Sequence, residues 1–260
     1  ALTWHGARYT QLDVGQGDAA VLQTEGRVLV IDTGSQGTSG LLDYLRHEGL
    51  SIDTLYISHP HEDHAGALVD VLAAGIPVGR ILLSDDLDEA RMDAPAREAL
   101  LTAQQRGIPI GGLHAGERES WGTGSAVEVL GPRPRSAAQD VNDRSLVLRF
   151  TVAGVRILTT GDVTQRAEPL AQVDCDVLKV AHHGSGAATG TDFLRAAGPR
   201  LALIGVGRRN LYGHPTPETL SRLFQAGARV LRTDQGGALL LTLADGQVRA
   251  QTFLSAEGVQ

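Results

Sequence analysis

Short apolar runs alternate with amphipathic segments along most of the 260-residue chain. Runs of valine, isoleucine and leucine that are apolar on both faces predict strands of sheets covered by helices. We expect strands at residues 9–18, 20–24, 27–32, 54–57, 80–83, 108–113, 126–130, 145–150, 155–160, 176–181, 201–206, 229–232 and 238–243. Helical spacing predicts helices at 40–48, 67–73, 94–106, 192–197 and 217–226. The pattern predicts an α/β fold, an αββα sandwich of two mixed sheets flanked by helices, with a site at the loop ends along the shared edge.

The length of the chain is typical of one domain. A chain of 260 residues buries one sizeable core, or two halves that share one core. The stretch Pro132–Ala137 holds two prolines and two arginines and is the best linker candidate. We therefore expect a single domain over residues 1–260, with two halves joined near residues 132–140. Thr216 and Pro217 predict the N-cap and first turn of the last helix.

Composition and charge narrow the class of protein. Apolar residues make up 42% of the chain and charged residues 20%, as in ordinary soluble globular proteins. We expect no transmembrane segment and no signal peptide, and the start at Ala1 suggests an excised domain or a mature form. The net charge of −7 argues against a tight grip on duplex DNA, which usually needs a basic face. Arg208 and Arg209 are candidates for a local basic patch, so we expect weak, transient contact with nucleic acid.

The densest chemical signal is the stretch Ser58–Gly66, directly after an expected strand. His59, His61, Asp63 and His64 place three imidazoles and a carboxylate within six residues. Such a cluster is hard to explain as packing, because buried polar groups without partners are costly. A metal ion gives each ring nitrogen a partner. The spacing predicts two adjacent ions, with His59 and His61 on one and Asp63 and His64 on the other.

The cluster has the pattern His-x-His-x-Asp-His, and on it the chain resembles the metallo-β-lactamase superfamily. The segments Ile31–Gly34, Leu158–Asp162 and Lys179–Ser185 resemble further motifs of that superfamily, in chain order. The chain also resembles the C-terminal domain of ComEC competence proteins, over roughly residues 8–240, in Leu12–Ala19, Ser58–Gly66, Asn142–Leu148, His182–Ser185 and Asn210–Pro215.

The resemblance extends the candidate metal site. Asp162 follows Gly161 at a strand end, and its carboxylate is expected to bridge the two ions. Of His182 and His183 one is expected to be a ligand, and we favour His182, with His183 beside it or facing the substrate. Asp32 is expected to orient a metal-binding histidine through a hydrogen bond rather than to bind metal itself.

Four more residues have open roles. Asp18, on a glycine-rich turn, either lines the site or only forms the turn. His214 is a candidate general acid or phosphate donor, or a loop histidine without a role. Ser185 either hydrogen-bonds a phosphate oxygen or turns its loop. Lys179 is the only lysine of the chain, and on a buried strand it would need a carboxylate partner.

The chain departs from the fuller superfamily pattern at one ligand. Many members have a third histidine for the first ion, where this chain reads Asn142-Asp143-Arg144-Ser145. The first ion would then keep positions for water, Asn142 or substrate, which suits metal-assisted hydrolysis. The loss argues against a β-lactamase. It weakens zinc retention and is compatible with manganese, so we expect two divalent ions, Mn²⁺ or Zn²⁺.

The resemblance implies a two-metal phosphodiesterase that acts on DNA and degrades the strand that is not taken up during natural transformation. Asp63 would help to hold the attacking water, and His214 would protonate the leaving group. Single-stranded DNA is favoured over duplex. The resemblance also implies tethering to a membrane channel domain of the same polypeptide, on the extracytoplasmic side of the cytoplasmic membrane.

Three alternatives stay open. One is an enzyme for small phosphodiesters, similar to phosphorylcholine esterases. Hydrolysis of a lactone, thioester or lactam is disfavoured by the missing third histidine. The last is a nucleic-acid-binding module without catalysis, which has kept a degraded metal site.

Overall fold

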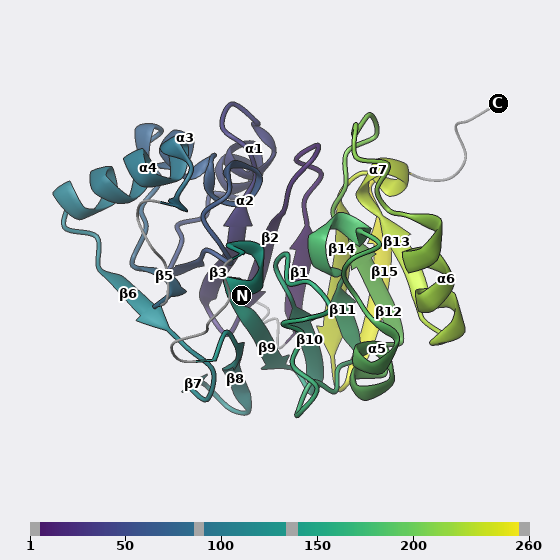
Figure 1. The fold of residues 1–260 in the computed structure, drawn as a ribbon. Helices are drawn as coiled ribbons and strands as arrows, with labels where there is room; N and C mark the ends of the chain where they lie inside the picture. Colours follow the sequence, from purple (N-terminus) through teal and green to yellow (C-terminus); the bar gives the residue numbers. More distant parts are fainter. Residues whose placement is uncertain (1–5, 86–90, 134–139, 255–260) are drawn as a thin grey trace.

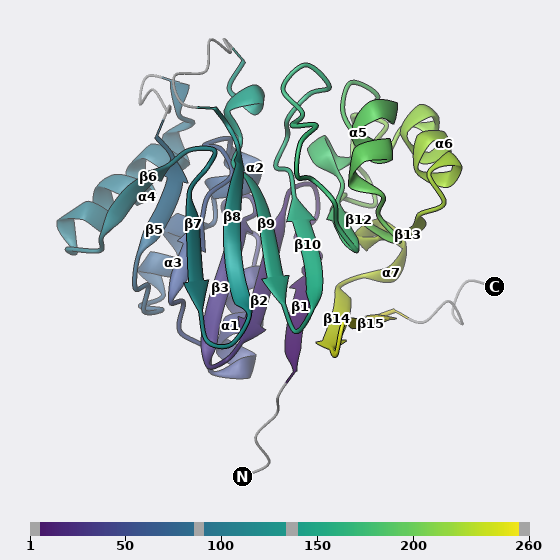
Figure 2. The same ribbon diagram turned by 90° about the horizontal axis from the view of Figure 1, so that it is seen from below.

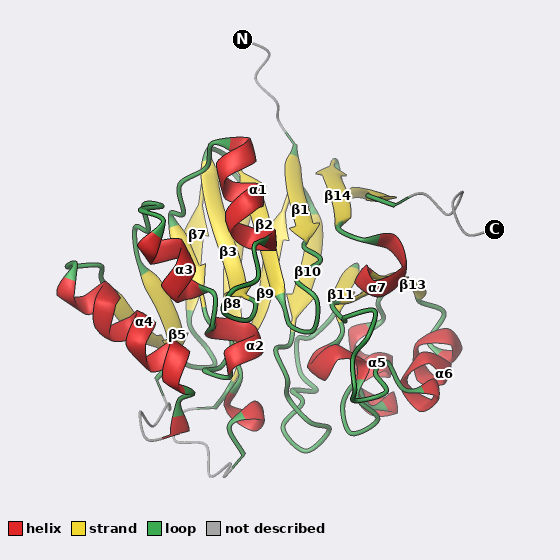
Figure 3. Ribbon diagram, turned by 90° about the horizontal axis from the view of Figure 1, so that it is seen from above, coloured by secondary structure: helices red, strands yellow, loops and turns green. Residues whose placement is uncertain are grey.

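The computed structural model describes residues 6–85, 91–133 and 140–254. Two mixed β-sheets face each other, and helices cover the outer face of each (Figure 1, Figure 3). The expected αββα sandwich of the α/β class is therefore confirmed. No helix in the described ranges is long and apolar enough to cross a membrane.

The first sheet combines the N-terminal strands with the last two strands of the chain. Its order is β15-β14-β1-β2-β3-β4-β5-β6. The pairs from β14 to β3 are antiparallel, and those from β3 to β6 are parallel. The strands are β1 (Ala7–Gln11), β2 (Ala19–Thr24), β3 (Arg27–Thr33), β4 (Thr54–Tyr56), β5 (Ile81–Ser84), β6 (Ile110–Leu113), β14 (Leu239–Ala244) and β15 (Gln247–Thr252).

The second sheet has the order β13-β12-β11-β10-β9-β8-β7, and Figure 2 shows its antiparallel part from β7 to β10. From β10 to β13 its strands are parallel. The strands are β7 (Arg118–Trp121), β8 (Ser125–Gly131), β9 (Val147–Val152), β10 (Val155–Thr159), β11 (Val177–Lys179), β12 (Leu201–Ile204) and β13 (Arg229–Arg232).

The helices pack on the outer faces of the sheets through apolar stripes. The N-terminal group is α1 (Gly40–Glu48), α2 (Glu62–Ala65), α3 (Leu68–Ala73) and α4 (Ala94–Gln105), and the C-terminal group is α5 (Thr191–Ala197), α6 (Pro217–Gln225) and α7 (Thr233–Gly236). Two short 3₁₀ turns, η2 (Asn142–Arg144) and η3 (Ala181–Gly184), lie in the loops of the second sheet. Leu41 and Leu45 of α1 pack against the first sheet, and Phe193 of α5 packs against the second.

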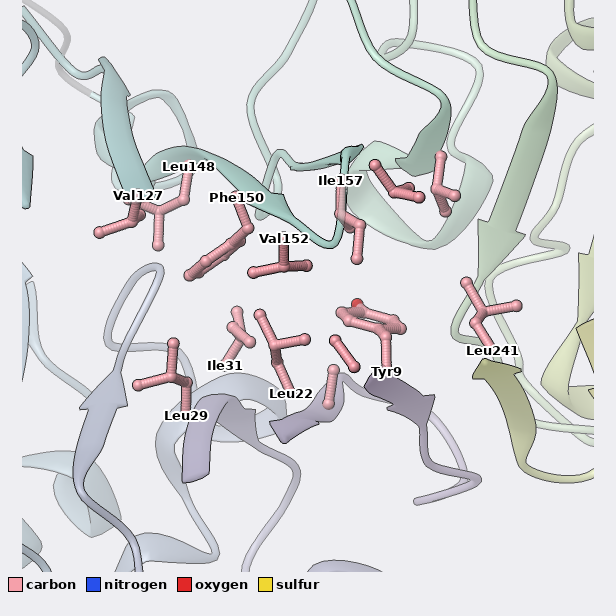
Figure 4. Close-up of a cluster of buried hydrophobic side chains, with 14 of the residues drawn as sticks. Tyr9, Leu22, Leu29, Ile31, Val127, Leu148, Phe150, Val152, Ile157 and Leu241 are labelled. Carbon is pink, nitrogen blue, oxygen red and sulfur yellow. The ribbon is translucent and has the colours of Figure 1, made fainter. Parts of the chain in front are cut away.

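The core lies between the two sheets (Figure 4). Tyr9 and Leu22 come from the first sheet, and Phe150 and Ile157 come from the second. The rings of Tyr56 and Phe150 meet edge to face, with centroids 5.6 Å apart. Burial of these large side chains is the main favourable contribution to folding. The core thus fixes one sheet against the other, which holds the loops at the strand ends in place.

The expected and observed elements differ mainly at the sheet edges. The bounds of Gly40–Glu48 and Arg229–Arg232 agree with the prediction, and the Thr216 side chain accepts a hydrogen bond from the Thr219 N–H as an N-cap does. The expected strand 9–18 ends at Gln11, because a turn with glycines at positive φ follows it.

The expected linker falls largely outside the described residues, since residues 134–139 are not described. The segments before and after this stretch of the chain do not correspond to one sheet each. β7 and β8 precede it and pair within the second sheet, whereas β14 and β15 follow it and join the first sheet, where β14 pairs with β1. The chain therefore crosses between the two sheets on both sides of the expected joint.

Candidate metal centre

The candidate residues lie where strands of both sheets end. The β4 strand leads into the loop with His59 and His61, and α2 carries Asp63 and His64. Asp162 follows β10, and His182 and His183 follow the adjacent parallel strand β11 in η3. Because the carboxyl ends of parallel strands meet at one edge of a sheet, residues far apart in sequence come together there.

Asp162 lies at the middle of this arrangement. Its carboxylate is buried and lies 3.2 Å from His64 Nε2 and 4.0 Å from His59 Nε2. The Nε2 atoms of His182 and His183 each lie 3.7 Å from Asp162 Oδ2. Its backbone N–H donates to Ser145 Oγ at 3.1 Å, which fixes the turn after β10. One carboxylate thus faces four imidazoles.

A buried network around Asp32 sets the orientation of two histidines. Asp32 accepts hydrogen bonds from the Ser58 N–H at 2.6 Å, from Ser58 Oγ at 2.7 Å and from His64 Nδ1 at 2.8 Å. Since the Ser58 hydroxyl gives its hydrogen to Asp32, His59 Nδ1 donates to Ser58 Oγ at 3.1 Å. Both rings therefore turn Nε2 towards the centre. The role expected for Asp32, orienting a histidine, agrees with this geometry.

His183 is oriented in the same way by the backbone. Its Nδ1 donates to the carbonyl oxygen of Gly205 at 2.9 Å, which leaves Nε2 at 3.1 Å from Asp63 Oδ2. His182 and His183 have φ angles of 50° and 53°. Two successive non-glycine residues in this left-handed region are strained, and such strain clusters at functional sites. His182 is the more exposed of the two, with 28% of its side chain accessible.

Asp18 and Lys179 form a buried ion pair beside His183. Lys179 Nζ lies 2.5 Å from Asp18 Oδ2, and it also donates to the Val180 carbonyl oxygen at 2.8 Å. Gln11 Nε2 donates to Asp18 Oδ1 at 3.2 Å, and Asp18 Oδ2 lies 3.7 Å from His183 Nδ1. The only lysine of the chain thus has the carboxylate partner that its buried position requires.

Two glycines make room for this part of the site. Gly17 has φ 140°, and a Cβ there would lie 2.4 Å from the carbonyl oxygen of Asp63. That same oxygen accepts the Asp18 N–H at 3.0 Å. At Gly205 a Cβ would lie 2.1 Å from Asp18 Oδ1. Any larger residue at either position would displace Asp18 or the loop that carries it.

The remaining predicted residues lie at the margin. The His214 ring meets the His182 ring with centroids 5.7 Å apart. The Ser185 hydroxyl accepts the Ala187 N–H at 3.3 Å and so engages its own loop. Asn142 Oδ1 is buried without a hydrogen-bond partner among the described residues. The Asn142 carbonyl oxygen accepts the N–H of Ser145, whose hydroxyl accepts the Asp162 N–H.

The charges of the centre are strongly coupled. Burial opposes ionisation of Asp162 and Asp63, but the neighbouring histidines hold the pKa of both carboxyls well below the usual range. Burial also disfavours protonation of His64, but Asp162 and Asp32 raise its pKa well above the usual value. Burial and the nearby His64 lower the pKa of His59. The carboxylates therefore stay ionised, and positive charge gathers around them.

The donor set fits divalent metal ions. His64 Nε2, Asp162 Oδ1 and His182 Nδ1 are buried without a hydrogen-bond partner in the described structure. Four buried residues each offer one ligand atom, and these four atoms all lie within 4.8 Å of one another: Asp18, His64, Asp162 and His183. Metal-binding histidines commonly donate their outer N–H to a carboxylate or carbonyl, as His64 and His183 do here. Imidazole and carboxylate ligands suit zinc and manganese alike.

Sequence reasoning gave no role to Ser58, Ser145, Gln11 or the Gly205 carbonyl. Ser58 stands inside the histidine motif and Ser145 inside the asparagine motif, so their positions were visible but their partners were not. Gln11 lies on β1, and no local pattern connects it with Asp18. These contacts arise within each sheet, between loops at the ends of its strands.

Replacing Asp32 by asparagine should weaken manganese binding by about 10- to 100-fold, as is typical when a residue that orients a ligand is lost. The amide would present N–H groups to Ser58 Oγ and His64 Nδ1, both of which now donate to Asp32. Competition with a chelating dye measures the affinity. Asp53→Asn is the matched control, since the Asp53 carboxylate accepts the Val28 N–H at the opposite end of these strands. Equal affinity in both variants would contradict the orienting role.

Comparison with known proteins agrees with this geometry. A family model described as the metallo-beta-lactamase superfamily matches residues 12–208. ComE operon protein 3 of Bacillus subtilis is 30% identical over 88% of this chain and 32% of its own length. Competence protein ComA of Neisseria gonorrhoeae is 32% identical over 94% of this chain and 33% of its own length. Both are ComEC-type competence proteins, and the chain spans about a third of their length.

Known structures share the fold. Igni18, a metallo hydrolase from Ignicoccus hospitalis, matches with a TM-score of 0.59 and 15% identity, over 95% of this chain and 100% of its own. The metallo-beta-lactamase fold protein YhfI from Bacillus subtilis matches with a TM-score of 0.59 and 14% identity, over 90% of this chain and 99% of its own. At these identities the likeness concerns the fold alone.

Proposed function

Because the chain belongs to the metallo-β-lactamase superfamily, we propose that it is a metal-dependent phosphodiesterase that hydrolyses DNA. In this account the histidine and aspartate centre holds two divalent ions. The substrate is a DNA strand, single-stranded rather than duplex.

The observation that carries the proposal is the orientation of three buried histidines. His59, His64 and His183 each use Nδ1 for an outward hydrogen bond. Their Nε2 atoms face ionised carboxylates. In a neutral imidazole whose Nδ1 carries the hydrogen, Nε2 is an acceptor, so Nε2 and the carboxylate oxygen are two acceptors with no proton between them. A metal ion resolves that conflict. Protonation resolves it only in part, because crowded imidazolium rings repel one another.

The residues divide between two ions. His59 and His61 lie together, with 3.1 Å between His59 Nε2 and His61 Nδ1, and would hold the first. Asp63 and His64 would hold the second, and Asp162 lies within reach of both groups. For the second ion the geometry favours His183 over His182, because His183 Nε2 is the nearer to Asp63.

Bound divalent ions would lower the pKa of a water and neutralise charge on phosphoryl oxygens. The chain's own groups would do the rest. Asp63, partly exposed at the centre, would orient the attacking water by accepting a hydrogen bond. His214, whose ring contacts the His182 ring, would hydrogen-bond the leaving oxygen and transfer a proton to it. The buried hydrogen bonds of Ser58 and Asp32 would keep His59 and His64 in place, and that of Ser145 would keep Asp162 in place.

The relatives support DNA as the substrate. They are ComEC-type competence proteins, which supports a role in DNA uptake for this chain. We infer that it degrades the strand that is not taken up. The same relation supports attachment to a membrane channel domain on the extracytoplasmic side of the membrane. The net charge of −7 favours brief contact with the strand, which suits an enzyme that must release its product.

End-labelled DNA tests the proposal. Metal-stripped protein would be given single-stranded or duplex DNA and titrated separately with manganese and zinc. We expect cleavage that requires protein and metal together and is faster on single strands. The product ladder reports the polarity. Metal ions without protein, and protein with a chelator, are the controls.

If the loaded protein binds metal but cleaves neither DNA, the DNA hydrolase account is wrong. A small phosphodiester such as a choline phosphate ester, tested in the same way, would then separate another esterase from a module that only binds nucleic acid.

A further inference from the structure

The loop Gly207–His214 stands at the margin of the metal centre, and apart from His214 its residues have no role in the mechanism above. It runs from the end of β12 to His214, whose ring contacts His182. Its central residues are unusual for a loop tip, because Leu211 is 98% exposed and Tyr212 is 70% exposed. Large apolar side chains held this far into solvent commonly mark a binding surface.

A continuous row of rings joins this loop to the centre. The Tyr212 ring stacks on the His214 ring, with centroids 5.8 Å apart and planes at 25°. His214 in turn meets the edge of His182 at 5.7 Å, and His182 Nε2 lies 3.7 Å from Asp162. Tyr212 is therefore two ring contacts away from His182, which lies beside Asp162.

The loop is fixed in shape. Asn210 Nδ2 donates to the carbonyl oxygens of Gly207 at 3.0 Å and of His214 at 2.8 Å, and Asn210 Oδ1 accepts the His214 N–H at 3.0 Å. Gln16 Oε1 accepts the Gly207 N–H at 3.3 Å, which ties the loop to the turn before Asp18. Asn210 therefore links the two ends of the loop, so the exposed tip is held in a defined position.

The charge beside the tip is positive, although the chain as a whole is negative. Arg208 and Arg209 are exposed in the same loop, whereas the net charge is −7. An aromatic face next to cationic side chains is the combination that binds single-stranded nucleic acid, since bases stack on the ring while the cations meet the phosphates.

We propose that Tyr212, with Leu211 beside it, is a stacking platform for a base of single-stranded DNA, and that it places a neighbouring phosphodiester at the metal centre. The proposal rests on the proposed function and adds to it how the strand is recognised. It accounts for a preference for single strands, because a base paired within a duplex does not offer its face. Stacking of this kind tolerates every base, so recognition is independent of sequence.

Binding to strands with and without bases tests the platform. Manganese-loaded protein would be titrated with a fluorescent phosphorothioate oligonucleotide, which resists hydrolysis, and with the same backbone carrying abasic sites. We expect the natural strand to bind about 10-fold more tightly, in line with the usual contribution of stacking on one aromatic ring. In Tyr212→Ala this difference should disappear, whereas Tyr212→Phe and Tyr212→Trp should keep it.

Phe224→Ala is the matched control, because Phe224 is 82% exposed on α6 and has no described ring contact with the site. It should bind both strands as the wild type does. If Tyr212→Ala keeps the full preference for the natural strand, the platform is wrong, and a protein partner becomes the alternative for the exposed tip. If the wild type binds neither strand, DNA is not the substrate, and the result contradicts the proposed function and not the stacking platform alone.

Discussion

Replacing Asp162 by asparagine should lower the rate of DNA cleavage by about 10³-fold at saturating manganese, because several kcal/mol of charge stabilisation would be lost. Asp162 is the carboxylate that four imidazoles face, at 3.2–4.0 Å. Asparagine has nearly the same shape but no charge. It would present an NH₂ group, with two donors, to nitrogens that need a carboxylate or a shared metal ion opposite them.

Initial rates on an end-labelled single strand measure this effect. Asp192→Asn makes the same chemical change on the exposed surface of α5, where the carboxylate pairs only with Arg195, and it should cleave like the wild type. Unchanged circular dichroism would exclude loss of the fold. A variant at Asp162 that keeps more than about a tenth of the rate would contradict the bridging role, since lost bridging costs far more.

Replacing Lys179 by methionine should lower the free energy of unfolding of the metal-free protein by about 3–5 kcal/mol, as is typical when one partner of a buried ion pair is removed. The side chains of Lys179 and Asp18 are only 5% and 6% exposed. Methionine fills most of the same space, so the loss comes from the Asp18 charge left without its partner. Lys179→Arg should also destabilise, because the planar guanidinium does not match a site built for a compact ammonium.

The double variant Lys179→Met, Asp18→Asn separates charge from packing. Removing both charges together should restore most of the lost stability, since the pair is then replaced by neutral groups. Urea unfolding in the presence of a chelator gives the free energies. A single variant that loses less than about 1 kcal/mol, a value typical of exposed pairs, would show that water reaches this pair and that it does not hold Asp18 in place.

The elements that could be predicted are those whose sequence pattern is decided by burial. The helix Gly40–Glu48 buries Leu41 and Leu45 at helical spacing and ends at Gly49 in the left-handed conformation. The edge strands Arg118–Trp121 and Gln247–Thr252 were not predicted, because mostly polar, exposed residues give no apolar pattern. Each of them pairs with the strand next to it in the sequence, β7 with β8 and β15 with β14, so the pairing is local although the edge strand itself has no apolar pattern.

The metal centre could also be predicted only in part. The residues from His59 to His64 are close in sequence, so their spacing alone indicated a metal site. The partners of Lys179 and His183 come from other elements. Asp18 is brought to Lys179 by the packing of the two sheets, and the Gly205 carbonyl is brought to His183 by the pairing of β11 with β12. Tyr212 stood within a motif, but its exposure and its stacking on His214 could not be inferred from the sequence.

The most direct test of the account is the number of manganese ions that metal-stripped protein binds. Free Mn²⁺ would be followed by electron paramagnetic resonance during a titration of the protein. The account predicts two bound ions per chain, with the His59 and His61 ion released first because it lacks a third histidine, and at most one ion in Asp162→Asn. No tight binding, or two ions retained in Asp162→Asn, would contradict it.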